Sequence, residues 1–299
     1  MLKIYENRFK FLLLPAVIIV LGIIFYFVNG GFNVDVEFSG GTRLHVNMEQ
    51  SFNNEEVGNL IKEKAGVTAV VQRTGNGSEA IIKFKDDDKQ TASTKVFSAL
   101  KEQYKLKDSD LLETGILTAS YGAGMQKAAM MCVLWAVILM LLYITIRFEW
   151  RSAIIAILTL LSNVLCMIAF YAIFRLPINT SFVAAVLTIL GYSINDVIVV
   201  FDRIRESRSN KLNRKKDVTE VTELSIHQTI TRSVNTSVTT LVTIVVLYIM
   251  GVPTIKEFAL PIIIGILVGT YASIFIAAPM WAWWKDASDK QKRQAARAK

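Results

Sequence analysis

One carboxylate lies alone among the apolar segments of this sequence, and it is the first candidate for chemistry. Apolar runs occupy residues 11–28, 128–146, 152–174, 178–201, 234–252 and 258–284, and Asp196 is the only Asp, Glu, Lys or Arg within them. A carboxylate in a membrane span costs about 2.5–3.5 kcal/mol on insertion scales, so its presence requires a reason. Burial favours the protonated form and a nearby cation favours the ionised form, so such a group can take up and release a proton. We predict proton coupling at Asp196, with a structural polar group as the alternative.

Polar side chains accompany Asp196 along its expected helix. Thr188 and Tyr192 precede it at intervals of four residues, Asn195 is adjacent to it, and Arg203 follows seven residues later. Residues four apart lie on the same side of a helix. We therefore expect Thr188, Tyr192 and Asn195 to form a polar face that supports the carboxylate.

Arg232 is the natural partner for this carboxylate. Counted inward from the expected outer ends of their spans, Asp196 and Arg232 lie at depths of roughly 24 and 27 Å at helical rise. A hydroxyl-rich stripe follows Arg232 along the same span, formed by Thr236, Thr239, Thr240 and Thr243. Such a stripe suits a hydrated pathway or hydrogen bonds between helices. The pattern predicts an Asp196–Arg232 pair, with a charge at the membrane surface as the alternative for Arg232.

Signatures of covalent catalysis are missing from the sequence. It contains no phosphate-binding GxxxxGK[ST] loop, no HExxH helix and no GxSxG nucleophile elbow. His45 and His227 have no ligand partner at metal spacing, and Cys132 and Cys166 lie in different apolar runs, where small apolar packing is expected. We expect no enzymatic activity, no cofactor and no metal site.

The composition places these residues in a membrane protein. The chain is 53% hydrophobic with 19% charged residues, and each apolar run is long enough to cross a bilayer as a helix. Lys and Arg crowd segments 1–10, 147–151, 202–233 and 285–299, whereas the two short loops on the other side carry only Arg175 and Lys256. The positive-inside rule then puts both termini in the cytoplasm. The net charge of +8 is explained by topology, so no nucleic-acid partner is expected.

The one long polar segment predicts a folded domain between the first two spans. Strand patterns occur at 42–48, 67–73, 79–85 and 111–120, and helix patterns at 54–66 and 89–105, with a turn signal at 74–78. The order βαββαβ is that of a ferredoxin-like α+β domain, with both helices expected on one face of the sheet. The predicted organisation is therefore a first span within 1–28, an extracytoplasmic domain at 29–127 ending in a linker at 121–127, five further spans within 128–284 and a basic tail at 285–299.

Three motifs occur in order along the chain, namely DVEFSGGT at 35–42, GYSINDVIVVFDRIRE at 191–206 and TRSVNTSVTTL at 231–241. Together they resemble the SecD/SecF family of protein translocase subunits, which is related to the resistance–nodulation–division transporters. The residues that carry the match are Asp35, Phe38, Gly40, Gly41, Thr42, Gly191, Asp202 and Arg203. The entry into the second span, LTASYGAGMQ, departs from the proline-containing junction that the family leads us to expect.

The resemblance implies a SecF-like subunit of the bacterial inner membrane. Such a subunit works with a six-span SecD and the SecYEG channel, and uses the proton gradient to assist translocation of an unfolded polypeptide. It also implies that Asp196 and Arg232 are the proton-coupling carboxylate and its arginine, while Asp202 and Arg203 anchor the helix end. Two rival functions remain, a small-molecule exporter of the related superfamily and a translocon scaffold without energy coupling. A single carboxylate among hydroxyls suits either H⁺ or Na⁺ as the coupling ion.

Overall fold

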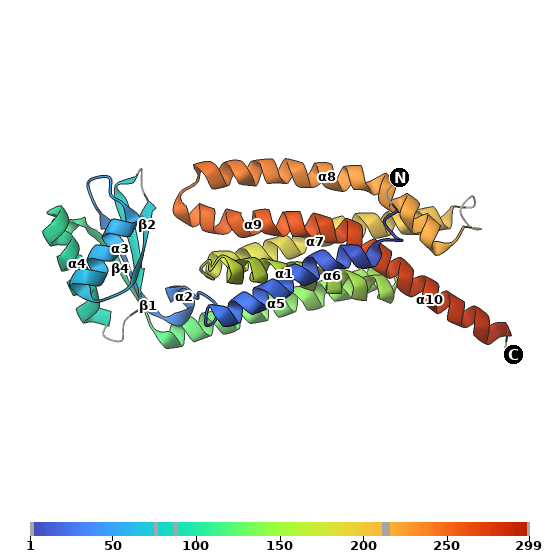
Figure 1. The fold of residues 1–299 in the computed structure, drawn as a ribbon, viewed down its shortest axis with the longest axis horizontal. Helices are drawn as coiled ribbons and strands as arrows, with labels where there is room; N and C mark the ends of the chain where they lie inside the picture. Colours follow the sequence, from blue (N-terminus) through green and yellow to red (C-terminus); the bar gives the residue numbers. More distant parts are fainter. Residues whose placement is uncertain (1–2, 75–76, 86–88, 211–215, 298–299) are drawn as a thin grey trace.

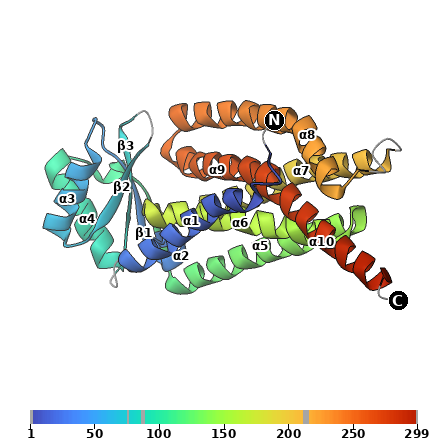
Figure 2. The same cartoon turned by 45° about the vertical axis from the view of Figure 1, so that its right-hand side comes forward.

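Long helices form a bundle, and a small α/β domain stands at one end of it in the computed structural model of the chain (Figures 1 and 2). The structure describes residues 3–74, 77–85, 89–210 and 216–297. Within these residues, six helical segments are long and apolar enough to cross a membrane, which confirms the predicted number of spans. They comprise α1 (Arg8–Val28), α5 (Ala119–Arg147), α6 (Trp150–Ile173), α7 (Thr180–Ser209), α8 (Val218–Met250) and α9 (Pro253–Ala272), the last running through the π-helical stretch η4 (Ser273–Ala277) into α10 (Ala278–Arg297).

The α/β domain has the predicted order of strands and helices. Its elements are β1 (Gly41–Asn47), α3 (Asn54–Ala65), β2 (Ala69–Thr74), β3 (Glu79–Phe84), α4 (Lys89–Tyr104), the short η2 (Asp108–Asp110) and β4 (Leu111–Leu117). The sheet order is β2-β3-β1-β4 with every pair antiparallel, the arrangement of a ferredoxin-like fold. Residues 75–76, at the centre of the predicted turn, lie outside the described residues.

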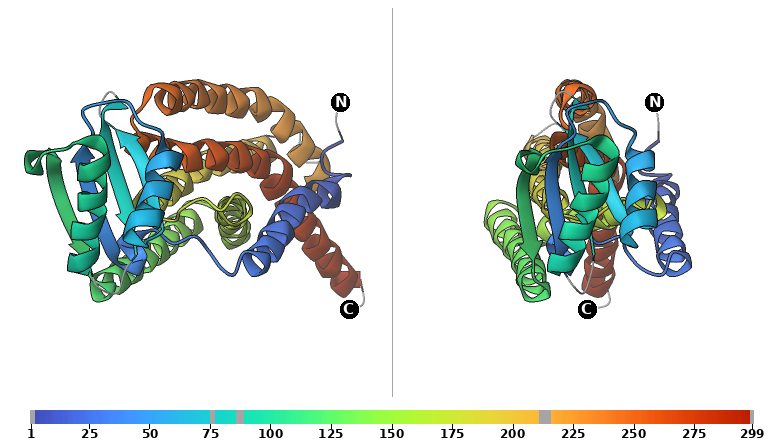
Figure 3. Two further views of the ribbon diagram at one scale, coloured as in Figure 1. Left: turned by 60° about the vertical axis from the view of Figure 1, so that its left-hand side comes forward. Right: turned by 90° about the vertical axis from the view of Figure 1, so that its left-hand side faces the viewer.

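The two helices of the domain cover one face of the sheet and leave the other face toward the bundle (Figure 3). Because strand side chains alternate between the two faces, Leu44 and Val46 of β1 join Ile82 of β3 in a core beneath the helices. Val57 of α3 and Val96 of α4 are fully buried against them. The alternate residues of β2 and β3 therefore point toward the membrane helices.

The residues at the two ends of α3 are types that commonly begin and end helices. Asn53 lies at the N-cap, where its side chain accepts a hydrogen bond of 3.0 Å from the backbone N–H of Glu55. Gly66 follows the last turn with a φ of 73°, the left-handed conformation in which glycine commonly ends a helix. Polar residues with local roles thus set the limits of this helix.

Glycines of the first motif allow the chain to pass closely between the domain and α5. Gly40 has a φ of 77°, and a Cβ built on it would lie 2.9 Å from the backbone nitrogen of Ala119. A Cβ on Gly41 would lie 2.6 Å from the carbonyl oxygen of Phe84. The next residue, Thr42, is fully buried in β1. The two glycines of the motif are therefore needed because the backbones pack too closely at the base of the domain for a larger residue.

Residues 121–127, which the sequence predicts as a linker, lie within the first three turns of α5. Thr118 caps the helix by accepting a hydrogen bond of 3.3 Å from the backbone N–H of Tyr121. The buried Phe38 fixes this part of α5, since its carbonyl oxygen accepts a hydrogen bond of 2.9 Å from Gln126 Nε2. Gly122 lies so close that a Cβ on it would be 2.5 Å from the same oxygen. The second span therefore begins directly after β4, with only Thr118 between the strand and the helix.

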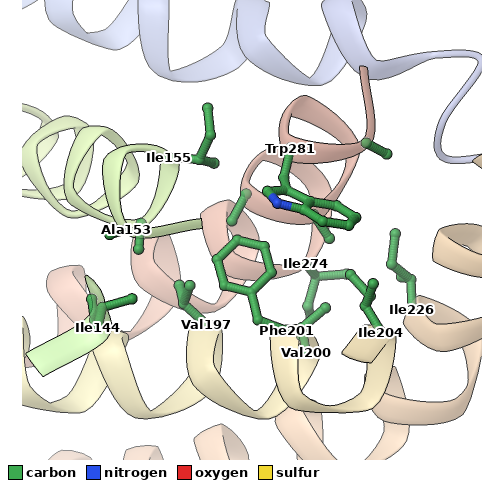
Figure 4. Close-up of a cluster of buried hydrophobic side chains, with 14 of the residues drawn as sticks. Ile144, Ala153, Ile155, Val197, Val200, Phe201, Ile204, Ile226, Ile274 and Trp281 are labelled. Carbon is green, nitrogen blue, oxygen red and sulfur yellow. The ribbon is translucent and has the colours of Figure 1, made fainter. Parts of the chain in front are cut away.

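At the opposite end of the bundle, buried apolar side chains of α7 pack against those of neighbouring helices (Figure 4), and ion pairs lie beside them. Phe201 is buried, with its ring 6.1 Å from that of Trp281 on α10. The carboxylate of Asp202 lies 3.0 Å from Arg205 on the next turn and 3.4 Å from Arg147 at the end of α5. These contacts suit the anchoring role that the motif implies for this end of α7.

Candidate functional site

Asp196 lies in the interior of the bundle, on the face of α7 that packs against α9 and η4. It is 7% exposed, and its Oδ2 accepts a hydrogen bond of 2.8 Å from the hydroxyl of the fully buried Ser273. Ser273 is the first residue of η4, and its Oγ also lies 3.0 Å from the carbonyl oxygen of Thr270. A π-helical turn inside an α-helix often marks a functional site.

Further polar side chains gather around this pair in the interior of the bundle. Gly269, one turn before Ser273, packs against Ser193 of α7 and Asn163 of α6. Across from them, the Oγ of Ser237 on α8 lies 2.6 Å from the Oγ1 of Thr270. Ser233, one turn before Ser237, is buried on the same side of α8. We call the following seven residues the polar core cluster: Asn163, Ser193, Asp196, Ser233, Ser237, Thr270 and Ser273.

Several groups of the polar core cluster have no hydrogen-bond partner. Both polar atoms of the Asn163 side chain and the hydroxyls of Ser193 and Ser233 are buried without one. Each of these residues is about 1% exposed. Buried polar groups in proteins are normally satisfied by protein groups or by bound water. The cluster therefore has the chemical character of a hydrated site around the carboxylate.

The hydroxyl of Ser273 can respond to the charge of Asp196. An ionised carboxylate only accepts hydrogen bonds, so Ser273 must donate to it. A protonated carboxyl can instead donate to the Ser273 oxygen, which leaves the serine proton free to bond the Thr270 carbonyl. Both arrangements use contacts within 3.0 Å, so protonation can proceed without leaving Ser273 unpaired.

Two glycines of α9 allow the close helix contact on which this geometry depends. A Cβ on Gly269 would lie 2.4 Å from Ser193 Oγ, and a Cβ on Gly265 would lie 2.5 Å from Ile189 Cγ1. Ile189 is branched at Cβ and 1% exposed, so it has little freedom to move away. The GxxxG spacing in the last span thus corresponds to direct contact between α7 and α9.

Gly265→Ala should therefore destabilise the bundle. The added methyl overpacks the contact with Ile189, and the expected loss is about 1–3 kcal/mol in the free energy of unfolding. Thermal unfolding in mild detergent measures it as a lower melting temperature. Gly191→Ala is the matched control, because no atom lies within 4 Å of its added Cβ. An equal effect of the two substitutions would contradict close packing at Gly265.

Arg232, the predicted partner of Asp196, lies elsewhere in this structure. Its side chain is exposed on α8, and among the ion pairs of the described residues none joins it to Asp196. The buried hydroxyl of Ser233 marks the inward side of α8 at this level. The pairing of Asp196 with Arg232 therefore stays a prediction about another conformation.

The residues predicted to support Asp196 are divided between the interior and the surface. The Tyr192 hydroxyl lies 3.4 Å from Ser237 Oγ and from Thr240 Oγ1, which ties α7 to α8 beside the polar core cluster. The other predicted members of this face, Thr188, Asn195 and Thr236, are exposed. The structure thus brings Tyr192 and Thr240 toward the cluster and leaves the others outside it.

Among the exposed residues of α7 and α8, small and polar side chains form one stripe on each helix within the membrane-spanning segments. The α7 stripe consists of small and polar residues, Ala184, Thr188, Gly191 and Asn195. The α8 stripe consists of Arg232, Thr236, Thr239 and Thr243. Thr240, which contacts Tyr192 of α7, is adjacent to Thr236 and Thr243 on the surface of α8, so helical spacing puts the two stripes beside each other. Polar side chains at such positions normally contact protein or water.

The residues that surround Asp196 in the structure could not be predicted from the sequence. Asn163 is the only amide residue in the apolar run 152–174, and Ser273 follows Thr270 by three residues in the last run. These two features could have indicated a polar site in the bundle. They are weak signals, because hydroxyl residues are common in membrane spans. Among the described residues, no three His, Cys, Asp or Glu side chains are grouped as a metal site would require.

Comparison with known proteins identifies relatives over nearly the whole chain. The family model described as "Protein export membrane protein SecD/SecF, C-terminal" matches residues 96–287. The protein translocase subunit SecF of Sebaldella termitidis is 34% identical, with 93% of this chain and 90% of that protein aligned. The protein translocase subunit SecDF of Bacillus subtilis is also 34% identical, but the aligned region is 94% of this chain and 38% of that protein.

Two solved structures have the same fold over most of this chain. The crystal structure of SecDF, a translocon-associated membrane protein from Thermus thermophilus, aligns with a TM-score of 0.77 and 31% identity over 94% of this chain. A structure of SecDF in a super-membrane-facing form aligns with a TM-score of 0.69 and 31% identity over 98% of it. The chain covers 38% and 39% of those two longer chains.

Proposed function

The chain belongs to the SecD/SecF family of protein export membrane proteins, and we propose that it is a SecF-like subunit that couples the proton gradient to polypeptide translocation. Its six spans make it a multi-pass membrane protein. The relatives are named protein translocase subunits, which agrees with a role in Sec export. The proposed location is the bacterial inner membrane with both termini in the cytoplasm, as the distribution of Lys and Arg predicts.

One feature supports proton coupling above all others, namely a buried carboxylate hydrogen-bonded to a serine at the start of a π-helical turn. Asp196 is 7% exposed, and the hydroxyls of the polar core cluster can solvate either of its protonation states. The unpartnered side chains of Asn163 and Ser193 provide donors and acceptors for a water path to it. No covalent step is needed for this function.

In the proposed cycle, Asp196 alternates between two partners. In one state the carboxyl is hydrogen-bonded to Ser273, as in this structure. In the other state the ionised carboxylate pairs with Arg232 after α7 and α8 have shifted relative to each other. One charge moving through the membrane potential supplies roughly 2.3 kcal/mol per 100 mV, enough to bias two conformations that differ by a few kcal/mol.

The partner subunit in this proposal is a SecD-like protein with six spans of its own. The α7 and α8 stripes give it a surface on which to pack, because small residues permit close helix approach and polar ones form hydrogen bonds between helices. The longer SecDF relative, of which this chain covers 38%, is consistent with such a second half. SecYEG and the unfolded polypeptide are the further proposed partners, and the α/β domain would hold or release the emerging chain.

Asn195→Cys should crosslink to the SecD-like partner in native membranes. The exposed side chain of Asn195 lies on the α7 stripe, so a cysteine there would be at the subunit contact. Ser193→Cys is the matched control, because Ser193 is 1% exposed and faces Gly269 in the interior. Mass spectrometry of the crosslinked product identifies the partner. Crosslinks from position 195 to lipid alone would contradict the proposed interface.

A further inference from the structure

A buried ionic cluster joins the α/β domain to the membrane helices. Lys83, on the face of β3 toward the bundle, lies 2.9 Å from Asp35 Oδ2 and 4.0 Å from Glu257 Oε1 of α9. The side chains of Lys83, Asp35 and Glu257 are 7%, 5% and 17% exposed. We call these three residues the ionic joint. It lies far along the helices from Asp196 and takes no part in the site described above.

The carboxylate of Glu257 connects three elements through its two oxygens. Its Oε1 accepts a hydrogen bond from the side-chain amide of Gln72 on β2, and its Oε2 accepts one from the side-chain amide of Asn179. Asn179 is the N-cap of α7 and also accepts a hydrogen bond of 3.0 Å from the backbone N–H of Phe182. A single side chain of α9 therefore contacts both the sheet and the first turn of α7.

The segment between α1 and β1 reinforces the same contact. Asp35 caps the short helix α2 (Val36–Ser39), and its backbone N–H donates a hydrogen bond of 3.1 Å to the carbonyl oxygen of Ile178. The next acid, Glu37, accepts hydrogen bonds of 3.0 and 2.6 Å from the backbone N–H and hydroxyl of Thr180, the first residue of α7. The start of α7 is thus bonded both to this segment and to Glu257.

The two helices that meet at the ionic joint also carry the groups that respond to the proton. Asp196 follows Asn179 by 17 residues on α7, and Ser273 follows Glu257 by 16 residues on α9 and η4. At helical rise these separations are roughly 26 and 24 Å, so Asp196 on α7 and Ser273 on η4 lie at nearly the same distance from the joint. A movement of this helix pair at Asp196 and Ser273 would therefore carry Glu257 with it.

We propose that the ionic joint fixes the sheet rigidly to the ends of α7 and α9, with Glu257 as the positioning residue. The α/β domain then moves with these two helices as one body, and no hinge opens between them. The consequence for export rests on the proposed function, whereas the rigidity of the joint does not. The buried Asp35 carboxylate pairs with the Lys83 ammonium group, and the partly buried Glu257 carboxylate lies 4.0 Å from it. Removal of Lys83 leaves Asp35 without its cation, which is strongly destabilising for a buried ion pair.

Crosslinking across the junction tests the proposal in the full chain in native membranes. Val70 and Pro177 line one cleft beside the joint, on the domain side and the membrane side respectively. Val70→Cys and Pro177→Cys would be combined with replacement of the two native cysteines and treated with a short bismaleimide. The crosslinked peptide pair is quantified by mass spectrometry in energised membranes and in membranes treated with an uncoupler.

The expected yield is the same with and without the gradient. Lys83→Met should lower it on the order of tenfold because the buried Asp35 carboxylate is left without its cation. Lys85→Met is the matched control, because Lys85 is exposed, lines the same cleft and should leave the yield unchanged. Glu257→Ala is the second variant. It keeps the Asp35–Lys83 pair, so the chain should fold. It removes the bonds to Gln72 and Asn179, so it should still lower the crosslinking yield several-fold.

A several-fold change in yield on energising the parent membranes would overturn the proposal, because it would show that the junction opens. Unchanged yields in both Lys83→Met and Glu257→Ala would also overturn it. If export in the same membranes shows no response to the gradient, the proposed function fails. The crosslinking yields still decide whether the joint is rigid, so the two failures are distinguishable.

Discussion

Asp196→Asn should abolish the gradient-dependent part of export while the chain remains inserted, folded and bound to its partner. Asn has nearly the same shape and can still accept the hydrogen bond from Ser273, so the packing at η4 should persist. It cannot ionise, so the membrane potential no longer acts on this position. The lost bias, roughly 2.3 kcal/mol per 100 mV for one charge, corresponds to about 50-fold in the ratio of two conformations.

Pulse–chase labelling of a secreted precursor in cells measures this effect as slowed processing. Membrane levels of the variant and recovery of its partner in mild detergent check that the chain is intact. Asp202→Asn is the matched control on the same helix, because Asp202 is half exposed and pairs with Arg147 and Arg205 at the surface. Exposed pairs of this kind contribute about 0–1 kcal/mol, so export should be nearly normal. Equal defects in the two variants would argue against a special role for Asp196.

Arg232→Ala should be nearly as damaging as loss of the carboxylate. Without the guanidinium, the proposed second state leaves an ionised Asp196 unpaired inside the membrane, which is strongly unfavourable. Arg232→Lys should retain part of the activity, since the charge remains but the planar two-pronged donor is lost. In the same pulse–chase measurement, precursor processing should be fastest in the parent, slower in Arg232→Lys and slowest in Arg232→Ala.

Arg175→Ala and Lys256→Ala provide the controls for the arginine prediction. Both residues lie outside the apolar runs, at the domain end of the bundle, and neither belongs to the polar core cluster. Loss of either charge should leave gradient-dependent export within about twofold of the parent, because Arg175 is exposed, Lys256 is partly exposed and neither takes part in the proposed proton cycle. A normal phenotype for Arg232→Ala would remove the arginine from the cycle and leave Asp196 with Ser273 alone.

Much of the fold could be predicted because its signals are local. Uninterrupted apolar runs give the spans, and alternation between Gly41 and Leu117 gives the strands of the domain. Asn53 and Gly66 mark the ends of α3 through bonds and conformations within a few residues of each other. Such patterns do not depend on how the elements later pack.

The composition of the site could not be predicted, because it depends on how helices cross. Asp196 is identified by its type alone, but its bond to Ser273 requires the approach that Gly269 permits and the π-helical turn at Ser273. Lys83 has the sequence pattern of a solvent-exposed strand residue, yet it is buried because that face of the sheet rests on α9. Thr188 shows the opposite outcome: it has the predicted spacing from Asp196, yet its side chain is exposed on the surface of the bundle.

The most direct test of proton coupling is translocation of a purified precursor into inverted membrane vesicles at saturating ATP. Vesicles with the parent chain or Asp196→Asn are compared while energised and after addition of an uncoupler. The parent should translocate faster when energised, and the Asp196→Asn vesicles should translocate at the uncoupled rate under both conditions. If Asp196→Asn vesicles respond to the gradient as the parent does, Asp196 is only a buried polar group and the coupling account is wrong.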